Sequence, residues 1–168
     1  MALAMFLVSA VFAQEEESPR MWAGGELTFG SLSARQVTIG PSWGMMLTDE
    51  LGVGASIYFS AGDDSFAWGF DPYARYYIPV VDKFSFYGDA YVGLGGGNNN
   101  TAIEGHEGYF SFSVGARVGL QYWFTSSWSI AASTRVLDFT LLDGDASFGG
   151  GLNANSVNFS LFWHFFRQ

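Results

Sequence analysis

Residues 70–95 read FDPYARYYIPVVDKFSFYGDAYVGLG and contain two runs in which residue types alternate one by one. One set consists of Phe70, Ala74, Tyr76, Ile78, Phe84, Phe86, Ala90, Val92 and Leu94. The other set consists of Asp71, Tyr73, Arg75, Tyr77, Ser85, Tyr87, Asp89, Tyr91 and Gly93. A period of two is typical of β-strands whose two faces differ. Because only residues 79–83 separate the two runs, the stretch predicts two antiparallel strands joined by a tight turn.

The same alternation continues on both sides of this stretch, and no segment has the period of an α-helix. It predicts eight strands, each about ten residues long, over residues 26–30, 37–45, 51–60, 66–78, 84–94, 110–124, 128–136 and 156–165. After the first connection, near residues 31–34, the connections alternate in length. Residues 48–50, 79–83 and 125–127 form tight turns, whereas residues 61–65, 95–108 and 141–154 form looser loops. Short turns at one end and long loops at the other predict an all-β, eight-stranded antiparallel up-and-down barrel.

The composition narrows the class of protein. The chain has 168 residues, no cysteine, a net charge of −9 and 49% hydrophobic residues. The absence of cysteine excludes disulfides and thiolate chemistry. A single lysine, Lys83, and the acidic balance argue against nucleic acid as a partner, since phosphate binding needs a basic surface. The longest apolar run, the first fourteen residues, is too short for a membrane helix of about 20 residues.

The apolar face of the barrel is expected to point outward. A soluble barrel would bury that face, but an eight-stranded barrel is only just wide enough for its interior side chains. The large apolar side chains of this chain would not fit inside, whereas the mostly small residues of the other face suit a narrow lumen. We therefore expect a transmembrane barrel. Its interfacial aromatic girdle is predicted to comprise Trp22, Trp43, Tyr76, Tyr122, Phe124, Trp128, Trp163 and Phe165.

Charged residues on the small-residue face predict an ionic network inside the barrel. The acids are Glu26, Asp71 and Asp89, the bases are Arg75, Arg117 and Arg135, and His164 lies beside them. Buried charges persist when they are paired, so this set predicts a salt-bridge network that plugs the lumen. The alternative is a selectivity lining or a proton path.

The N-terminal segment has the features of an export signal. Residues 1–13, MALAMFLVSAVFA, are apolar and end in small residues, and Gln14 and three glutamates follow. This pattern predicts a signal peptide over residues 1–13 and a barrel domain over residues 14–168. A buried N-terminal strand or helix is the alternative.

Three stretches carry a family resemblance: VTIGPSWGMMLTDELGVGASIYF (37–59), residues 70–95, and NSVNFSLFWHF (155–165). They resemble the small eight-stranded outer-membrane barrels of the OmpA/OmpX type, especially the stand-alone outer membrane protein beta-barrel domain proteins common in Bacteroidetes. The resemblance implies a cell outer membrane location, with membrane lipid and lipopolysaccharide as contacts. It also implies insertion by the barrel-assembly machinery, which reads the terminal strand. In this chain Phe166, Arg167 and Gln168 follow the aromatic residue that normally ends that signal.

A search for catalytic patterns favours a protein that is not an enzyme. His106-Glu107-Gly108 does not supply the pairing that lipid-modifying barrels need, and Asp143-Gly144-Asp145 is too small a ligand set for calcium. We expect no catalytic residues, no metal and no cofactor. The expected role is structural or interactive, through extracellular loops whose ligand or surface partner the sequence does not identify. A narrow pore for water, ions or small solutes is the alternative, and a lipid-modifying enzyme comes third.

Overall fold

A computed structural model describes residues 21–29, 37–62, 65–99, 107–143, 145–151 and 157–165. Residues 1–20, which include the predicted signal peptide, lie outside the described residues. The described part consists of strands and turns, and it contains no helix. The strands are β1 (Met21–Phe29), β2 (Val37–Met46), β3 (Leu51–Gly62), β4 (Ser65–Val81), β5 (Phe84–Asn99), β6 (Glu107–Trp123), β7 (Trp128–Leu142), β8 (Asp145–Gly150) and β9 (Asn158–Phe165).

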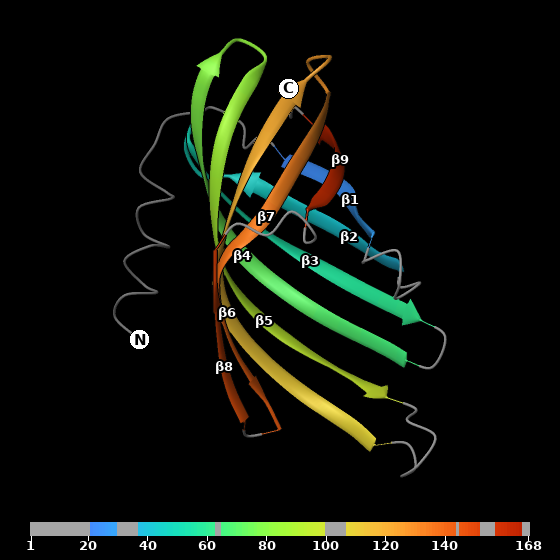
Figure 1. Cartoon of the computed structure of the whole chain (residues 1–168). Helices are drawn as coiled ribbons and strands as arrows, with labels where there is room; N and C mark the ends of the chain where they lie inside the picture. The colour runs from blue at the N-terminus through green and yellow to red at the C-terminus, as the bar shows by residue number, and fades with distance from the viewer. Residues whose placement is uncertain are drawn as a thin grey trace.

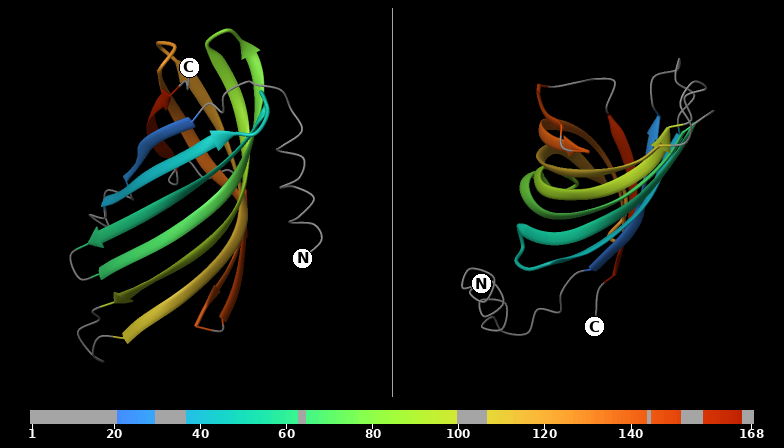
Figure 2. Two further views of the ribbon diagram at one scale, coloured as in Figure 1. Left: turned by 180° about the vertical axis from the view of Figure 1, so that it is seen from behind. Right: turned by 90° about the horizontal axis from the view of Figure 1, so that it is seen from below.

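The strands form a closed antiparallel ring. Each of β1 to β7 pairs with the next strand in the chain, β7 pairs with β9, and β9 pairs with β1. The ring therefore has eight strands, β1–β7 and β9, which curve around a common interior (Figures 1 and 2). The remaining strand, β8, pairs with the other half of β7, so β8 and β9 together follow β7 along its length. The predicted fold is confirmed.

Strand lengths differ from the prediction. Strands β4 to β7 have 15 to 17 residues rather than about ten, and they extend into regions expected to be loops. Residues 95–99 belong to β5, and residues 145–150, expected within a loop, form β8. The extension of β5, GGGNN, consists of glycine and asparagine. Backbone pairing alone suffices to form a ladder, so the strands continue past the point where apolar alternation ends.

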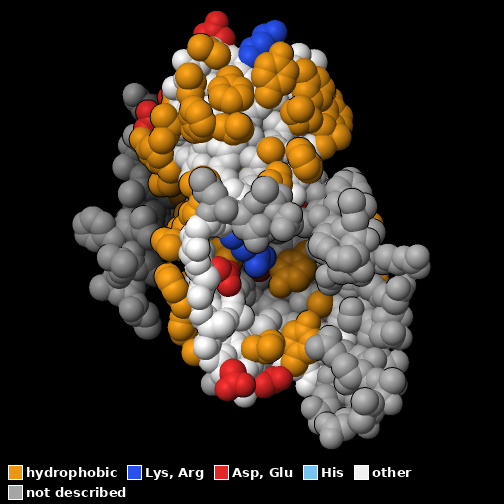
Figure 3. Space-filling view, viewed as in Figure 1, with side chains coloured by type: hydrophobic (Ala, Val, Ile, Leu, Met, Phe, Trp, Pro, Cys, Tyr) orange, Lys and Arg blue, Asp and Glu red, His pale blue; other side chains and the backbone are white. Residues whose placement is uncertain are grey.

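The outer surface of the ring is apolar. Each of the eight ring strands exposes at least one large hydrophobic side chain, for example Ile39, Phe86 and Leu161, at 46 to 57% exposure. The buried set includes Arg75, Asp89 and Arg117, each at most 3% exposed. In Figure 3 hydrophobic side chains cover much of the outer surface, whereas arginine and carboxylate side chains are visible in a hollow. This distribution is the reverse of that in a soluble protein, and it is the one expected when lipid hydrocarbon surrounds the barrel. No helix in the described ranges is long and apolar enough to cross a membrane.

The narrow interior is packed by large rings set against glycines of the adjoining strand. The ring of Tyr73 on β4 lies against Gly54 of β3, where an added Cβ would come 2.7 Å from the tyrosine oxygen. In the same way, the rings of Tyr58, Tyr87 and Tyr91 lie against Gly69, Gly119 and Gly115, respectively. The glycines of the polar face therefore make room for tyrosines in the narrow interior.

Strand β7 contains a β-bulge that reverses its faces. Ala116 pairs with Leu137, but Arg117 pairs with Arg135, so Val136 is an extra residue without a partner on β6. Beyond the bulge, odd-numbered residues face outward and Asp138 faces the interior. The alternation predicted an uninterrupted strand over residues 128–136, whereas the inserted residue shifts the period of β7 by one.

Candidate functional site: the filled lumen

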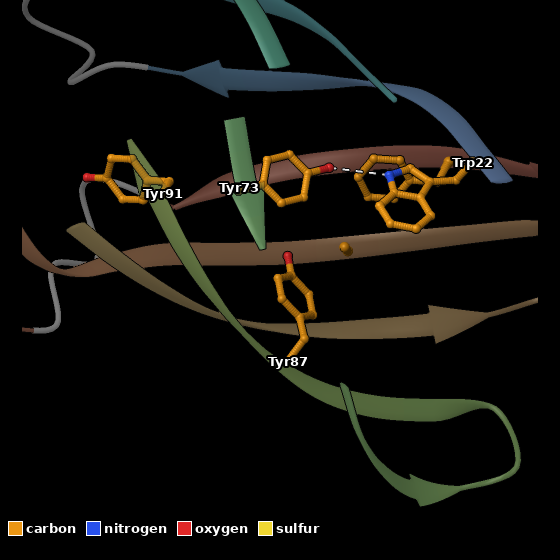
Figure 4. Close-up of a cluster of buried hydrophobic side chains, with 6 residues drawn as sticks. Trp22, Tyr73, Tyr87 and Tyr91 are labelled. Atoms are coloured by element: carbon orange, nitrogen blue, oxygen red, sulfur yellow. Dashed lines mark hydrogen bonds between the residues drawn. The ribbon is translucent and has the colours of Figure 1, made fainter. Parts of the chain in front are cut away.

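The end of the lumen near the chain termini is filled by an aromatic cluster. Trp22 and Tyr73 are 2% and 4% exposed, and the Trp22 Nε1–H donates to the Tyr73 hydroxyl at 3.3 Å (Figure 4). The Tyr73 hydroxyl also lies 3.0 Å from Ser42 Oγ. The indole ring occupies the space that side chains at Gly44 and Gly52 would need.

Trp22 is therefore not part of the membrane-facing girdle, and its predicted place there is wrong. It shares the inward face of β1 with Glu26, four residues further along the strand, because residues an even number apart point to the same side. The low exposure of Trp22 and its hydrogen bond to an inward tyrosine both follow from that register.

A chain of polar side chains lies beside this cluster. Gln121 Nε2 donates to Ser129 Oγ at 2.9 Å, and Ser129 Oγ lies 2.9 Å from His164 Nε2. Gln121 and Ser129 are completely buried, and His164 is 6% exposed. The His164 ring packs on Trp123 at 4.0 Å between centroids. His164 thus contacts neutral groups rather than the ionic network in which the sequence placed it.

The ionic centre is formed by four of the predicted residues. Arg75 makes a bidentate pair with Asp89, with Nε–Oδ1 at 2.7 Å and Nη2–Oδ2 at 2.9 Å, and both side chains are almost fully buried. Arg117 lies on the other side of Asp89, with Nε 3.5 Å from Oδ2. Arg117 Nη1 is 3.9 Å from Glu26 Oε2. Two arginines and two carboxylates therefore neutralise each other across β1, β4, β5 and β6.

Arginine and tyrosine side chains alternate along the lumen. The guanidinium of Arg75 lies 3.9 Å from the ring centroid of Tyr87 and 5.1 Å from that of Tyr73. Arg117 lies 5.3 Å from Tyr73 and 4.9 Å from Tyr91, and Arg135 lies 5.6 Å from Tyr91. Each guanidinium is thus held near aromatic faces, an attraction worth about 0.5 to 2 kcal/mol per contact.

Arg135 and Asp71 lie outside the ionic centre. Arg135 pairs with Asp138 at 3.9 Å, and its side chain is 46% exposed. Asp138 also accepts a hydrogen bond from the Tyr91 hydroxyl. Asp71 lies against Gly93, and none of the four ion pairs among the described residues includes it. Asp138 was missed because the predicted seventh strand ended at residue 136, although the apolar residues pass from even to odd positions between Val136 and Leu137.

The remaining predicted girdle residues lie near one end of the barrel. Trp43, Tyr76, Tyr122, Phe124, Trp128 and Trp163 are 40 to 49% exposed on outward positions, and Phe165 is half-buried. All lie toward the end that carries the tight turns and the termini of the ring. Trp163 packs edge-on against Phe165 at 3.8 Å between centroids. At the opposite end the exposed aromatics Phe66, Trp68 and Phe110 occupy outward positions that the sequence reading did not include in the girdle.

The site offers little chemistry. No group of three or more histidines, cysteines or carboxylates able to hold a metal occurs in the described ranges. Ser129 and His164 are within hydrogen-bond reach, but His164 is otherwise packed against Trp123 and Phe162, neither of which could orient an imidazole as a catalytic acid does.

A closed ring of eight antiparallel strands, apolar outside and filled with paired charges and tyrosines inside, defines a membrane-spanning β-barrel. The sequence matches the family described as outer membrane protein beta-barrel domain over residues 1–165, so the chain belongs to that family. Its location is the outer membrane. No curated protein matches the chain.

Solved structures share the fold at low sequence identity. The N-terminal β-barrel domain of Pseudomonas aeruginosa OprF is 20% identical with a TM-score of 0.58, and the match covers 90% of this chain and 100% of that one. Neisserial surface protein A is 13% identical with a TM-score of 0.53, covering 87% and 92%. Ail, the attachment invasion locus protein of Yersinia pestis, is 16% identical with a TM-score of 0.53, covering 90% and 100%.

Replacement of Asp89 by alanine should strongly destabilise the barrel. The change leaves the buried guanidinium of Arg75 without its carboxylate and removes one of the two carboxylates near Arg117. We therefore expect the free energy of unfolding to fall by about 3 to 5 kcal/mol. Urea unfolding of the protein in lipid vesicles measures it. Asp82→Ala, in an exposed turn, is the control and should stay within about 0.5 kcal/mol of the wild type. Equal stability of both variants would contradict a structural role for the ionic centre.

Proposed function

We propose that the protein is a non-conducting, non-catalytic scaffold in the outer membrane that acts through its extracellular connections. One observation carries the proposal: the lumen is filled across its section by buried side chains. Arg75, Gln121 and Phe162, from β4, β6 and β9, are each at most 2% exposed. A conducting pore needs a continuous water-filled path, and this packing argues against one.

The orientation follows from the connections. Barrels of this kind have short periplasmic turns and longer extracellular loops. The tight turns at residues 47–50, 82–83 and 124–127 lie at one end of the barrel, together with the start of β1 at Met21 and the end of β9 at Phe165. We assign this end to the periplasm. Residues 30–36, 63–64, 100–106 and 152–156, which connect the opposite strand ends, are then extracellular.

The charge of these connections favours a partner with a basic or neutral surface. The acids in or next to these connections and the turn between β7 and β8 are Asp63, Asp64, Glu104, Glu107, Asp143 and Asp145, and Arg35 is the single arginine or lysine there. Complementary charge steers binding, and like charge opposes it. Ail has been crystallised with the heparin analogue sucrose octasulfate. The acidic connections of this chain argue against a similar polyanionic ligand.

Export and insertion complete the proposal. We assign residues 1–13 to a signal peptide and residues 14–168 to the barrel domain. The barrel-assembly machinery would recognise β9, whose last outward residues are Trp163 and Phe165. The backbone of β9 then pairs with β1 and closes the ring. Lipid and lipopolysaccharide are the expected contacts of the apolar outer surface.

Conductance measurement distinguishes the scaffold from the pore. The refolded protein in a planar bilayer should give no stable single-channel steps, because the ionic centre and aromatic cluster close the lumen. Gramicidin added to the same bilayer serves as the positive control for the recording. Reproducible steps that depend on the presence of the barrel would contradict the proposal and support the pore.

Binding of sucrose octasulfate tests the proposed charge preference. The barrel in nanodiscs of neutral lipid should bind no detectable ligand by titration calorimetry, even at an ionic strength of about 10 mM, where screening is weak. Ail in the same nanodiscs is the matched positive control. Binding by this chain at a strength comparable to that of Ail would contradict the assignment of an acidic binding surface.

A further inference from the structure

The extracellular end of the outer surface carries a groove of about 420 Å³ on β4, β5 and β6. Its outward-facing lining consists of Phe66, Trp68, Gly96, Asn98, Gly108 and Phe110. The three aromatic side chains are 43 to 56% exposed. The groove lies at the end of the barrel opposite the tight turns, and its volume falls in the range of small-molecule sites.

The strand register produces the groove. On β5, Gly96 lies between Trp68 of β4 and Phe110 of β6. In the next outward row, Asn98 lies between Phe66 and Gly108. Two glycines thus form the floor, and aromatic rings form the walls. One row closer to the membrane centre, Leu94 lies between Phe70 and Phe112 and continues the apolar band.

Packing within the protein does not require glycine at residue 108. A Cβ at this position would meet only the carbonyl oxygen of Gly97, at an ordinary 3.8 Å. The inward glycines differ, since tyrosine rings or backbone atoms occupy the space beside them. At Gly96 an added Cβ would lie 3.4 Å from Trp68 Nε1, so the indole ring lies close to the strand. The absence of a side chain at residue 108 leaves the groove open toward the surroundings.

The position and lining point to one kind of occupant. The groove borders the apolar band at its extracellular end, the depth at which interfacial aromatics meet lipid headgroups. Its described lining holds no arginine or lysine, and the neighbouring connections at residues 63–64 and 100–107 hold none either, so a phosphate group would find no counter-charge. A sugar ring presents a face of weakly positive C–H groups, which suits the negative faces of Trp68 and Phe110. Its hydroxyls suit the Asn98 amide, which both donates and accepts hydrogen bonds.

We propose that this groove binds the neutral sugar ring of a glycolipid headgroup in the outer leaflet, stacked between Trp68 and Phe110. The acyl chains of the same lipid would lie along the apolar surface below Leu94. The proposal rests on the orientation assigned under the proposed function, but it does not depend on what the extracellular connections bind or on whether the lumen conducts.

Lipid selectivity in nanodiscs tests the proposal. The wild-type barrel is placed in nanodiscs with equal amounts of monoglucosyl diacylglycerol and phosphatidylcholine of the same acyl chains, and retained lipids are counted by native mass spectrometry. The expected preference for the glucolipid is at least about threefold, the factor that one aromatic stacking contact supplies. Trp68→Leu, which removes the flat ring, and Gly108→Leu, which fills the groove, should both reduce the ratio to about one.

Trp43→Leu is the matched control, because Trp43 is 44% exposed on an outward position at the periplasmic end. Its glucolipid preference should equal that of the wild type, and circular dichroism verifies that each variant is folded. The proposal is overturned if the wild type shows no preference, or if either Trp68→Leu or Gly108→Leu retains it. Equal loss in Trp43→Leu also overturns it, since the preference would then belong to the aromatic surface in general.

Discussion

The structure depends on closure of the hydrogen-bonded ring between β9 and its neighbours β1 and β7. In hydrocarbon an unpaired backbone N–H or C=O costs several kcal/mol, so the strands crossing the membrane must find partners on both sides. Closure with eight strands leaves an interior about as wide as the side chains that fill it. The packing of Tyr73 against Gly54, and of other rings against other glycines, is the consequence of that narrow width.

The same closure determines how charges are accommodated. The Arg75–Asp89 pair is almost completely buried, where leaving one ion without its partner would cost about 3 to 5 kcal/mol. Pairing with carboxylates and contact with tyrosine faces together replace the lost hydration. The interior is thus polar yet filled, and the apolar side chains remain on the outside. Transport would require a water-filled path past these residues, whereas stability requires that they be packed and paired. Their burial is the arrangement that stability requires.

The alternation of residue types was sufficient to predict the ring, the outward apolar face and the charged residues Arg75, Asp89, Arg117 and Glu26 on the inward face. It was not sufficient where the period changes. The extra residue Val136 turns Asp138 inward, and the adjacent apolar pair Val136 and Leu137 marks this change of phase, but the predicted strand ended at residue 136. Trp22 was assigned by residue type instead of by its register with Glu26. The lengths of β4 to β6 were underestimated because ladder pairing continues through glycine-rich segments that lack alternation.

Those glycine-rich extensions give the outer end of the barrel its distinct surface. Beyond Leu94, toward the end opposite the tight turns, Gly96, Asn98 and Gly108 lie between the aromatic residues of the outer face. At the end with the tight turns, Gly25 lies among Phe84, Tyr122 and Leu161 in a second groove of the outer surface, of about 440 Å³. The groove opposite the tight turns differs from this one in its lining, because Asn98 adds a hydrogen-bonding group to the apolar area.

Spin-label accessibility along β7 tests the inside-out arrangement most directly, because the chain has no native cysteine and single cysteines can be introduced from residue 128 to 141. We predict lipid-side oxygen accessibility at residues 128, 130, 132 and 134, then at 137, 139 and 141, with the phase reversed at the bulge. Low accessibility to oxygen at these positions, or an unbroken alternation through residue 136, would contradict the account.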